Sequence, residues 1–298
     1  PAHYHATTAR AIPAGGPPFV ASCCTIPMSI IGQVFADLRQ SGRKAFIPFV
    51  TAGDPDLAFT AAVLQELARR GCTIGEVGVP YSDPIADGPV IQASYTRALD
   101  QKIKLHQILE TLRGVAPRLS MPLVAMVSYA IVLRHGIERF VTDAQQAGLV
   151  GAIVPDLPVE ESAQLAQVCR RQDFSLIQLV TPTTPRDRAV RIAEQSTGFL
   201  YYVSVTGITG ERRDLPPELV DNVGWLRTQT SLPICIGFGI SQPEHVRVVA
   251  PVADGVIVGS ALVRRMAEAS TKPRSDVLAS VGDLAQSLMG ALGPADKA

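Results

Sequence analysis

Short runs of β-branched and other apolar residues alternate with longer amphipathic stretches from Lys44 onward. Such runs are typical of buried strands, and apolar residues at every third or fourth position are typical of helices. The runs predict eight strands, at Ala45–Thr51, Thr73–Gly78, Leu123–Ser128, Gly151–Asp156, Ser175–Val180, Leu200–Ser204, Ile234–Gly237 and Gly255–Val258. Regular alternation of strand and helix predicts a parallel sheet built from βαβ units.

Prolines and glycines mark the ends of the predicted helices. Prolines are expected in first helical turns and glycines just past helix ends, here Pro55, Pro185 and Pro243, then Gly71, Gly148 and Gly198. Asp54 is expected to cap the helix that follows Pro55. After Met28, an N-terminal amphipathic helix is predicted from Ile31, Val34, Phe35 and Leu38, and a last one from about Asp276–Leu292.

Eight strands with eight crossovers favour a closed barrel over an open doubly wound sheet. The predicted fold class is therefore α/β, a single-domain (β/α)8 TIM barrel, and 298 residues suffice for a barrel of roughly 250. We expect the barrel at 28–292, a flexible tail at 293–298 and a leader at 1–27. The leader has neither helical nor strand periodicity, so we expect it to be disordered or not native; its lack of acidic residues leaves a transit peptide open.

Composition excludes several classes of protein. Hydrophobic residues make up 47%, but no apolar run approaches the roughly 18 residues of a membrane helix. A net charge of +0 does not suggest a nucleic-acid binder. The cysteines show no metal or redox spacing, so no metal site is predicted and a reducing cytoplasm is expected (Cys23, Cys24, Cys72, Cys169 and Cys235).

Barrel enzymes carry their chemistry at the carboxyl ends of the strands and in the loops that follow. Two such loops stand out by length, Val79–Pro89 and Val205 to about Pro217. Long loops in compact domains are usually functional or disordered. The first is expected to be ordered, because it is rich in proline and aspartate. The second contains Gly207 and Gly210, which suits a mobile lid.

Glu76 is the strongest catalytic candidate. Strand periodicity places Ile74, Glu76 and Gly78 on one face, so Glu76 faces the barrel axis if Ile74 does. Gly78 would leave room for a ligand. A carboxylate in an apolar barrel mouth should have a raised pKa, which suits general acid–base catalysis. The alternative is a structural glutamate held by a buried cation, but the other predicted strands offer no interior Lys or Arg.

Three glycine elements near the end of the chain predict a phosphate site. They are Thr209-Gly210, Gly237-Phe-Gly239 and Gly259-Ser260. Loops seven and eight of such barrels commonly bind phosphate through backbone N–H groups. One glycine alone would be explained by a tight turn, whereas three around one barrel end favour a site.

Six motifs of the chain are specific enough to identify a family: Ala45-Phe-Ile-Pro-Phe-Val-Thr-Ala-Gly-Asp-Pro55, Glu76-Val-Gly-Val-Pro-Tyr-Ser-Asp-Pro-Ile-Ala-Asp-Gly-Pro89, Val154-Pro-Asp-Leu-Pro-Val-Glu-Glu-Ser162, Ser204-Val-Thr-Gly-Ile-Thr-Gly210, Gly237-Phe-Gly-Ile-Ser241 and Val258-Gly-Ser260. The second is the most specific, because it is long and unusual in composition. On these motifs, the chain from about Met28 to Leu292 resembles the α subunits of tryptophan synthase. The resemblance implies a lyase that cleaves indole-3-glycerol phosphate to indole and glyceraldehyde 3-phosphate.

The family's catalytic pair falls on Glu76 and Asp87. The resemblance implies that Glu76 protonates indole C3 and then accepts a proton from the glycerol hydroxyl. Asp87, expected in a more polar loop, would remain ionised and stabilise positive charge near the indole N–H. The alternative for Asp87 is a turn residue before Gly88.

The resemblance also assigns binding roles. Phe49, Tyr129 and Tyr201 would wall the indole pocket, and Thr209 would tie the lid to Asp87. The N–H groups of Gly210, Gly239 and Gly259, with Ser260, would hold phosphate. Asp83 either contacts a partner subunit or caps the turn at Pro84, and Asp156 either orients the pocket or is a turn residue.

The family works as an α2β2 complex, in which pyridoxal phosphate belongs to the β subunit. No cofactor is expected in this chain, since Lys44, Lys102 and Lys104 do not lie at interior strand ends. One departure concerns the loop after Tyr129, which has Ile131 in a region where the family commonly has an Asn that touches the β subunit. This departure keeps a free-standing lyase open as an alternative. A barrel that mainly activates its partner is a further alternative, against which Glu76 and Asp87 argue. An isomerase barrel fits the fold but not the loop after the second strand.

Overall fold

Nine short parallel strands form one sheet in the computed structural model, which describes residues 29–84, 87–204, 217–237 and 239–293. The order is β5-β4-β3-β2-β1-β9-β8-β7-β6. The strands are β1 (Ala45–Thr51), β2 (Gly75–Gly78), β3 (Leu123–Met126), β4 (Leu149–Ile153), β5 (Ser175–Ile177), β6 (Leu179–Val180), β7 (Leu200–Val203), β8 (Ile234–Gly237) and β9 (Gly255–Val258).

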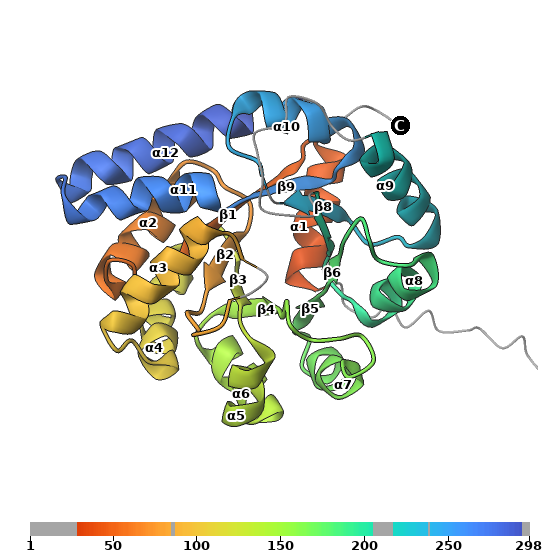
Figure 1. Cartoon of the computed structure of the whole chain (residues 1–298), viewed down its shortest axis with the longest axis horizontal. Helices are drawn as coiled ribbons and strands as arrows, with labels where there is room; N and C mark the ends of the chain where they lie inside the picture. The colour runs from red at the N-terminus through yellow and green to blue at the C-terminus, as the bar shows by residue number, and fades with distance from the viewer. Residues whose placement is uncertain (1–28, 85–86, 205–216, 238, 294–298) are drawn as a thin grey trace, which may run out of the picture.

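Helices follow the strands around the outside, as Figure 1 shows. They are α1 (Ile30–Gln40), α2 (Leu57–Arg69), α3 (Pro89–Asp100), α4 (Leu105–Val115), α5 (Tyr129–His135), α6 (Ile137–Gln146), α7 (Ala163–Arg171), α8 (Arg186–Gln195), α9 (Pro217–Gln229), α10 (Pro243–Val249), α11 (Ser260–Met266) and α12 (Arg274–Gly290). Short 3-10 turns lie at Ala116–Arg118, Ala250–Val252 and Ala267–Ser270.

The two ends of the sheet meet in the fifth predicted strand. That strand is interrupted at Gln178, so it appears as β5 and β6. β5 pairs with β4 and β6 pairs with β7. The carbonyl of Gln178 accepts a hydrogen bond from the Tyr201 N–H (3.1 Å). Because one continuous run of chain joins both edges, the sheet closes and the predicted (β/α)8 barrel is confirmed.

Two apolar layers follow from the alternation of side chains along each strand. In β1, Phe46 and Val50 belong to the layer between strands and helices, whereas Ile47 and Phe49 belong to the barrel interior. Ile74 also lies in the interior layer, as the strand periodicity predicts. All seven residues of β1 are buried, which explains why such strands are apolar throughout rather than alternating with polar residues.

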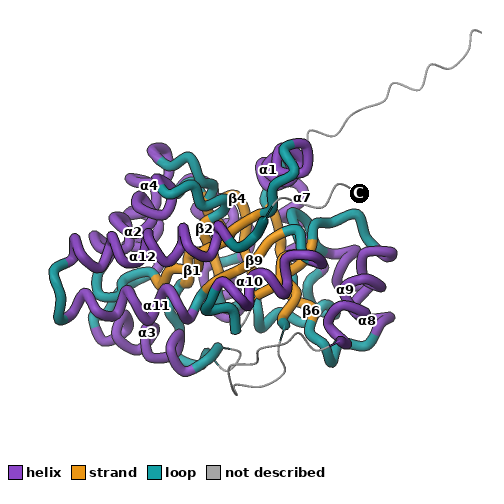
Figure 2. The backbone as a smooth tube through the Cα atoms, turned by 90° about the horizontal axis from the view of Figure 1, so that it is seen from above, coloured by secondary structure: helices purple, strands orange, loops and turns teal. Residues whose placement is uncertain are grey.

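Helix α1 covers one end of the barrel. Its buried residues Ile31, Phe35 and Leu38 belong to the interior layer. The Phe35 ring lies 5.9 Å from that of Phe199, which directly precedes β7. Figures 1 and 2 place α1 over the centre of the ring and at one edge of the barrel. The amino ends of the strands are thereby covered, and a ligand must enter at their carboxyl ends.

The start of α2 corrects two sequence predictions. Pro55 does not lie in its first turn but precedes it, joined to Asp54 by a cis peptide bond. Asp56 caps the helix by accepting a hydrogen bond from the Phe59 N–H (2.8 Å). Asp54 is therefore not the cap. The prediction that Pro55 lies in the first turn was wrong because the residue that caps α2, Asp56, comes after the proline.

Other boundaries differ by a few residues. The fourth strand begins at Leu149 and ends at Ile153 instead of spanning Gly151–Asp156, and the last helix spans Arg274–Gly290. Pro185 is the N-cap residue of α8, one position before its first turn, whereas Pro243 opens α10 as predicted. The predicted leader 1–27 and residues 294–298 of the predicted tail lie outside the described residues. Among the described helices, none is long and apolar enough to cross a membrane.

Candidate active site

A cavity of about 960 Å³ opens at the carboxyl ends of the strands. Its walls come from all around the barrel and include seven of the residues predicted from sequence: Phe49, Glu76, Asp87, Tyr201, Gly239, Gly259 and Ser260. Thr209 and Gly210 lie outside the described residues. Within the described residues, Tyr129 is not part of the lining. The structure thus brings both candidate carboxylates and the glycine elements of loops seven and eight into one space.

Glu76 lies in β2, where it is fully buried yet still lines the cavity. Neither carboxylate oxygen has a hydrogen-bond partner in the described structure. Burial, together with the nearby charge of Asp87, raises the pKa of Glu76 to about 8. The raised pKa agrees in direction with the expectation from sequence, and the carboxyl group keeps its proton at neutral pH.

Two aromatic rings lie over glycines in this part of the barrel. A Cβ atom on Gly78 would lie 2.4 Å from the Phe49 ring, and one on Gly237 would lie 2.5 Å from the Tyr201 hydroxyl. Real side-chain atoms do not approach so closely, so a side chain at either position would force the facing ring to shift. The space above Glu76 that sequence reasoning reserved for a ligand is therefore taken by Phe49, which forms the cavity wall instead.

Asp87 is held in a tight turn before α3. Its N–H donates to the Pro84 carbonyl (3.0 Å), and its own carbonyl accepts from the Gln92 side chain (2.8 Å). The carboxylate accepts a longer bond from the Tyr81 hydroxyl (3.4 Å). Asp87 is thus both a turn residue and a cavity residue, so its two alternatives do not exclude each other.

The surroundings of Asp87 differ from the polar loop that was expected, because only 6% of its surface is exposed. Burial raises its pKa to about 6, and the bond from Tyr81 opposes that rise. The expected ionised state at neutral pH still holds, since this pKa lies below 7. Glu76 and Asp87 therefore prefer opposite protonation states at pH 7.

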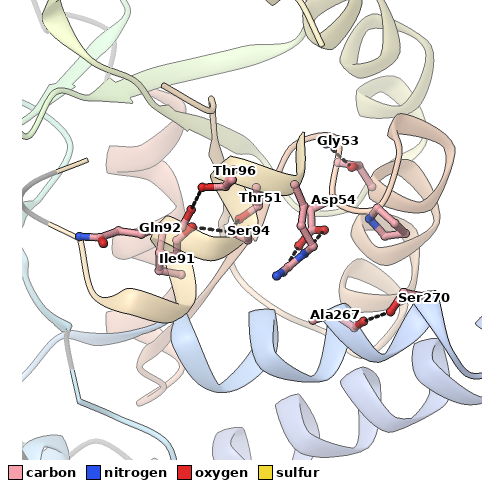
Figure 3. A network of polar contacts seen from close by, with 12 residues as sticks. Thr51, Gly53, Asp54, Ile91, Gln92, Ser94, Thr96, Ala267 and Ser270 are labelled. Carbon is pink, nitrogen blue, oxygen red and sulfur yellow. Dashed lines mark hydrogen bonds and ion pairs between the residues drawn. The ribbon is translucent and has the colours of Figure 1, made fainter. Parts of the chain in front are cut away.

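Helix α3, which starts just after Asp87, is anchored to the end of β1 by polar contacts. Thr51 and Ser94 share a buried hydrogen bond (2.6 Å). Arg97 donates two bonds to the buried carboxylate of Asp54 (2.9 and 2.7 Å). Figure 3 shows Thr51 and Ser94 pointing toward each other, with the ion pair of Asp54 beside them. These contacts fix the helix that carries the Asp87 turn. Sequence reasoning missed them, because the partners lie 43 residues apart.

Tyr129 and Asp156 form a separate cluster at the carboxyl ends of β3 and β4. Asp156 accepts hydrogen bonds from the Ser128 hydroxyl (2.7 Å) and the Tyr129 N–H (2.8 Å). The segment after β3, expected to be a loop, is helix α5. Tyr129 is its first residue and packs against the outer apolar layer. Asp156 also lines the cavity. Because it orients the start of α5 as well, it is more than the turn residue that was the alternative.

The part of the cavity wall at the carboxyl ends of β8 and β9 has the features of an anion site. Gly239, Gly259 and Ser260 line it, and Gly239 has a φ of +77°, a conformation that glycine adopts without strain. No cluster of three or more His, Cys, Asp or Glu side chains that could hold a metal ion occurs in the described part of the chain.

A (β/α)8 barrel whose cavity is lined by two buried carboxylates and by glycines at the carboxyl ends of β8 and β9 is typical of one class of protein: an acid–base enzyme for a small phosphorylated substrate. The family model described as tryptophan synthase alpha chain matches residues 35–289. The chain is 59% identical to the tryptophan synthase alpha chain of Rhodopirellula baltica over 251 residues, 83% of this chain and 90% of that protein. It is 44% identical to that of Arabidopsis thaliana over 248 residues, 82% and 90% of the two chains. The chain belongs to the tryptophan synthase alpha chain family.

Solved structures agree with this assignment. Tryptophan synthase subunit alpha from Legionella pneumophila superposes with a TM-score of 0.81 at 33% identity, covering 89% of this chain and 98% of that one. A Mycobacterium tuberculosis tryptophan synthase chain superposes with a TM-score of 0.81 at 32% identity, covering 89% of this chain and 98% of that one.

Proposed function

We propose that the chain cleaves indole-3-glycerol phosphate to indole and glyceraldehyde 3-phosphate, as the α subunit of tryptophan synthase in tryptophan biosynthesis. One observation supports this chemistry most directly. Two buried carboxylates face one cavity, and their pKa values of about 8 and about 6 leave one protonated and the other ionised at pH 7. Environments that push two pKa values apart are a recurring basis for assigning an acid and a base.

Glu76 is the proposed proton carrier. Its carboxyl group delivers a proton to indole C3, which turns the ring into a cationic electron sink. The bond between C3 and the glycerol chain then breaks, and its electron pair returns to the ring. Glu76, now ionised, accepts the proton of the adjacent glycerol hydroxyl as the aldehyde forms. Glu76 is therefore protonated again at the end of each turnover.

Asp87 is the proposed electrostatic partner. As an anion it stabilises positive charge near the indole N–H while C3 is protonated. The turn bonds to Pro84 and Gln92 fix its backbone, so its position is set before the substrate binds. Phe49 and Tyr201 supply the apolar wall against which an indole ring would lie.

The phosphate is proposed to bind where the carboxyl ends of β8 and β9 line the cavity. Ser260 and the N–H groups of Gly239 and Gly259 are the proposed ligands there, since all three line the cavity. Thr209 and Gly210 keep their proposed roles in the lid and at the phosphate. Tyr129 keeps its proposed place in the indole pocket only if α5 or the loops around it rearrange when substrate binds.

The β subunit is the proposed partner, in an α2β2 complex in which pyridoxal phosphate is held by the β subunit. Asp83 and Leu133 support a contact surface at the carboxyl ends of β2 and β3. Asp83 is exposed, and 52% of the Leu133 surface is exposed, which is unusual for a large apolar side chain at the end of the barrel where the cavity opens. We also propose a cytoplasmic location, supported by the free buried thiols of Cys72, Cys169 and Cys235.

A free-standing lyase is the second candidate, and Ile131 favours it. Where the family commonly has an Asn, Ile131 is half-buried and packs against the outer apolar layer of this chain. It therefore offers no polar group to a β subunit.

The decisive experiment measures indole release from indole-3-glycerol phosphate with and without a tryptophan synthase β subunit. Strong stimulation by the β subunit is expected from the α-subunit proposal. Full activity of the chain alone, unchanged by the β subunit, would favour the free-standing lyase. Absence of indole release in both assays, with activation of the β reaction retained, would leave only the role of a partner-activating barrel.

A further inference from the structure

Among the described residues, the side chains that line the cavity offer no surplus of positive charge. Apart from Glu76, which keeps its proton at pH 7, they include two carboxylates and two guanidinium groups: Asp87, Asp156, Arg188 and Arg264. A phosphate dianion that enters this cavity therefore meets as many acidic as basic groups. Backbone N–H groups and a hydroxyl supply hydrogen bonds but no full positive charge. The balance of charge therefore calls for a cation that is free to turn toward the phosphate.

The two guanidinium groups differ in what already binds them. Arg188 donates to Glu160 at 3.0 Å, so its charge is matched on the protein surface. Arg264 is exposed and makes no hydrogen bond or ion pair with any residue, as far as the described structure extends. Its guanidinium group can therefore turn toward a ligand without first breaking a contact within the protein.

Helix geometry directs Arg264 toward the anion site. It lies in α11, four residues after Ser260, and residues at that spacing share one face of a helix. Helical side chains tilt toward the amino end, so a long side chain covers the turn before its own Cα atom. The side chain of Arg264 thus lies over the turn that contains Ser260, and both residues line the same cavity.

The adjacent residue provides an internal comparison. Arg265 lies on a different face of α11 and donates to the Ser280 hydroxyl of α12 (2.6 Å). It lines a separate surface depression with Asp276 and Asp283. Arg264 and Arg265 thus carry the same charge on the same helix, but only Arg264 faces the cavity.

We propose that Arg264 is a phosphate ligand that supplies the positive charge missing from the site formed by Gly239, Gly259 and Ser260. The proposal rests on the proposed function, because it assigns this end of the cavity to the substrate phosphate. A planar guanidinium group can donate two parallel hydrogen bonds to phosphate oxygens. Arg264 acts on the phosphate rather than on the bond that breaks, so it strengthens the binding of substrate and transition state equally.

The test compares Arg264→Gln with Arg265→Gln, which remove the same charge from the same helix. The KM for indole-3-glycerol phosphate should rise about tenfold in Arg264→Gln while kcat stays within about twofold, which is the signature of lost uniform binding. The inhibition constant of glyceraldehyde 3-phosphate should rise in parallel. Both effects should shrink at high ionic strength, because salt screens an exposed charge. Arg265→Gln should behave like the wild type.

Direct titration with inorganic phosphate separates failure of this proposal from failure of the proposed function. If the wild type releases indole and Arg264→Gln keeps both its KM and its phosphate affinity, the assignment of Arg264 is wrong and the lyase function stands. If the wild type releases no indole but Arg264→Gln weakens phosphate binding relative to Arg265→Gln, the cationic site stands and the lyase function fails. Equal losses in both variants would attribute the effect to general charge and overturn the proposal.

Discussion

Asp54 and Glu76 are both buried carboxylates on neighbouring parts of the barrel, yet their surroundings are opposite. Asp54 follows β1, has 1% of its surface exposed and accepts two hydrogen bonds from Arg97. Glu76 lies in β2, is fully buried and has no hydrogen-bond partner for either oxygen in the described structure. The register pairs Glu76 with Phe49 of β1, so its neighbour on that strand is an aromatic residue, whereas Asp54 is paired with a cation.

The difference shows two ways in which a protein accommodates a buried carboxyl group. An ionised carboxylate needs a cation and hydrogen bonds, because burial removes its hydration. Without them the group keeps its proton, and its pKa rises. The first solution fixes structure, here the position of α3 relative to β1. The second stores a proton that can be transferred near neutral pH, so we assign chemistry to Glu76 and support to Asp54.

Removing the ionisable group of Glu76 should have the largest effect. Glu76→Gln keeps the size and burial of the side chain but can neither deliver nor accept the proton, so kcat for indole release should fall by about a thousandfold or more. Binding of glyceraldehyde 3-phosphate should be nearly unchanged. The exposed substitution Glu110→Gln is the matched control. Normal turnover of Glu76→Gln would remove Glu76 from the mechanism.

The same variant should change stability in the opposite direction. The folded-state pKa of Glu76, about 8, lies above its ordinary value of 4.5. Between these values the unfolded chain has lost a proton that the folded protein keeps, so this group destabilises the folded state increasingly as pH rises. Urea unfolding at pH 5 should show little difference between Glu76→Gln and the wild type, whereas at pH 8 the variant should be more stable. A wild type of equal or greater stability at pH 8 would contradict the unpaired state of Glu76.

Breaking the ion pair between Asp54 and Arg97 should instead lower the free energy of unfolding. Asp54→Asn leaves Arg97 without its counter-ion, and loss of one partner of a fully buried pair typically costs about 3–5 kcal/mol. Arg97 is 40% exposed and can regain water, so we expect about 2–3 kcal/mol in the free energy of unfolding. Urea unfolding measures it, with the exposed Asp100→Asn on the same helix as control. A loss below that of the control would show that the pair does not anchor α3.

The sequence predicted that Glu76 faces the barrel interior, but it did not predict the ion pair of Asp54. Strand periodicity identified Glu76, because its apolar neighbours at every second position define the inward face. Asp54 was assigned to a helix cap, since an aspartate before proline satisfies a local rule. Its true partner, Arg97, is distant in sequence, and only the folded barrel brings the two together.

In the fold as well, features set by the local sequence were predicted, whereas features set by contacts between distant residues were not. The strands Ala45–Thr51, Ile234–Gly237 and Gly255–Val258 match their predictions, because apolar runs with clear ends define them. The break at Gln178 was missed, since it arises from closure of the sheet rather than from local propensity. The burial of Asp87 was also missed, because the polar composition of its loop hides how Tyr81 and α3 pack around it.

The pH dependence of kcat/KM should be bell-shaped, with a maximum near pH 7. Activity should fall about tenfold per unit below pH 6, as Asp87 becomes protonated, and by a similar factor above pH 8, as Glu76 loses its proton. The two groups interact, so the limbs report values for the pair. The residual activity of Asp87→Asn should lack the acidic limb. A profile that is flat between pH 5 and 9 would contradict both assignments.

The smallest expected effect concerns Tyr81, whose hydroxyl is the one side-chain donor to the Asp87 carboxylate within the described residues. Its bond is long, at 3.4 Å, so it stabilises the anion only weakly. Tyr81→Phe should raise the pKa of Asp87 and move the acidic limb to higher pH, lowering kcat/KM at pH 6 by about two- to fivefold. Tyr202→Phe is the control, because Tyr202 belongs to the outer apolar layer rather than the barrel interior. If the acidic limb stays in place, Asp87 is kept ionised by groups other than Tyr81.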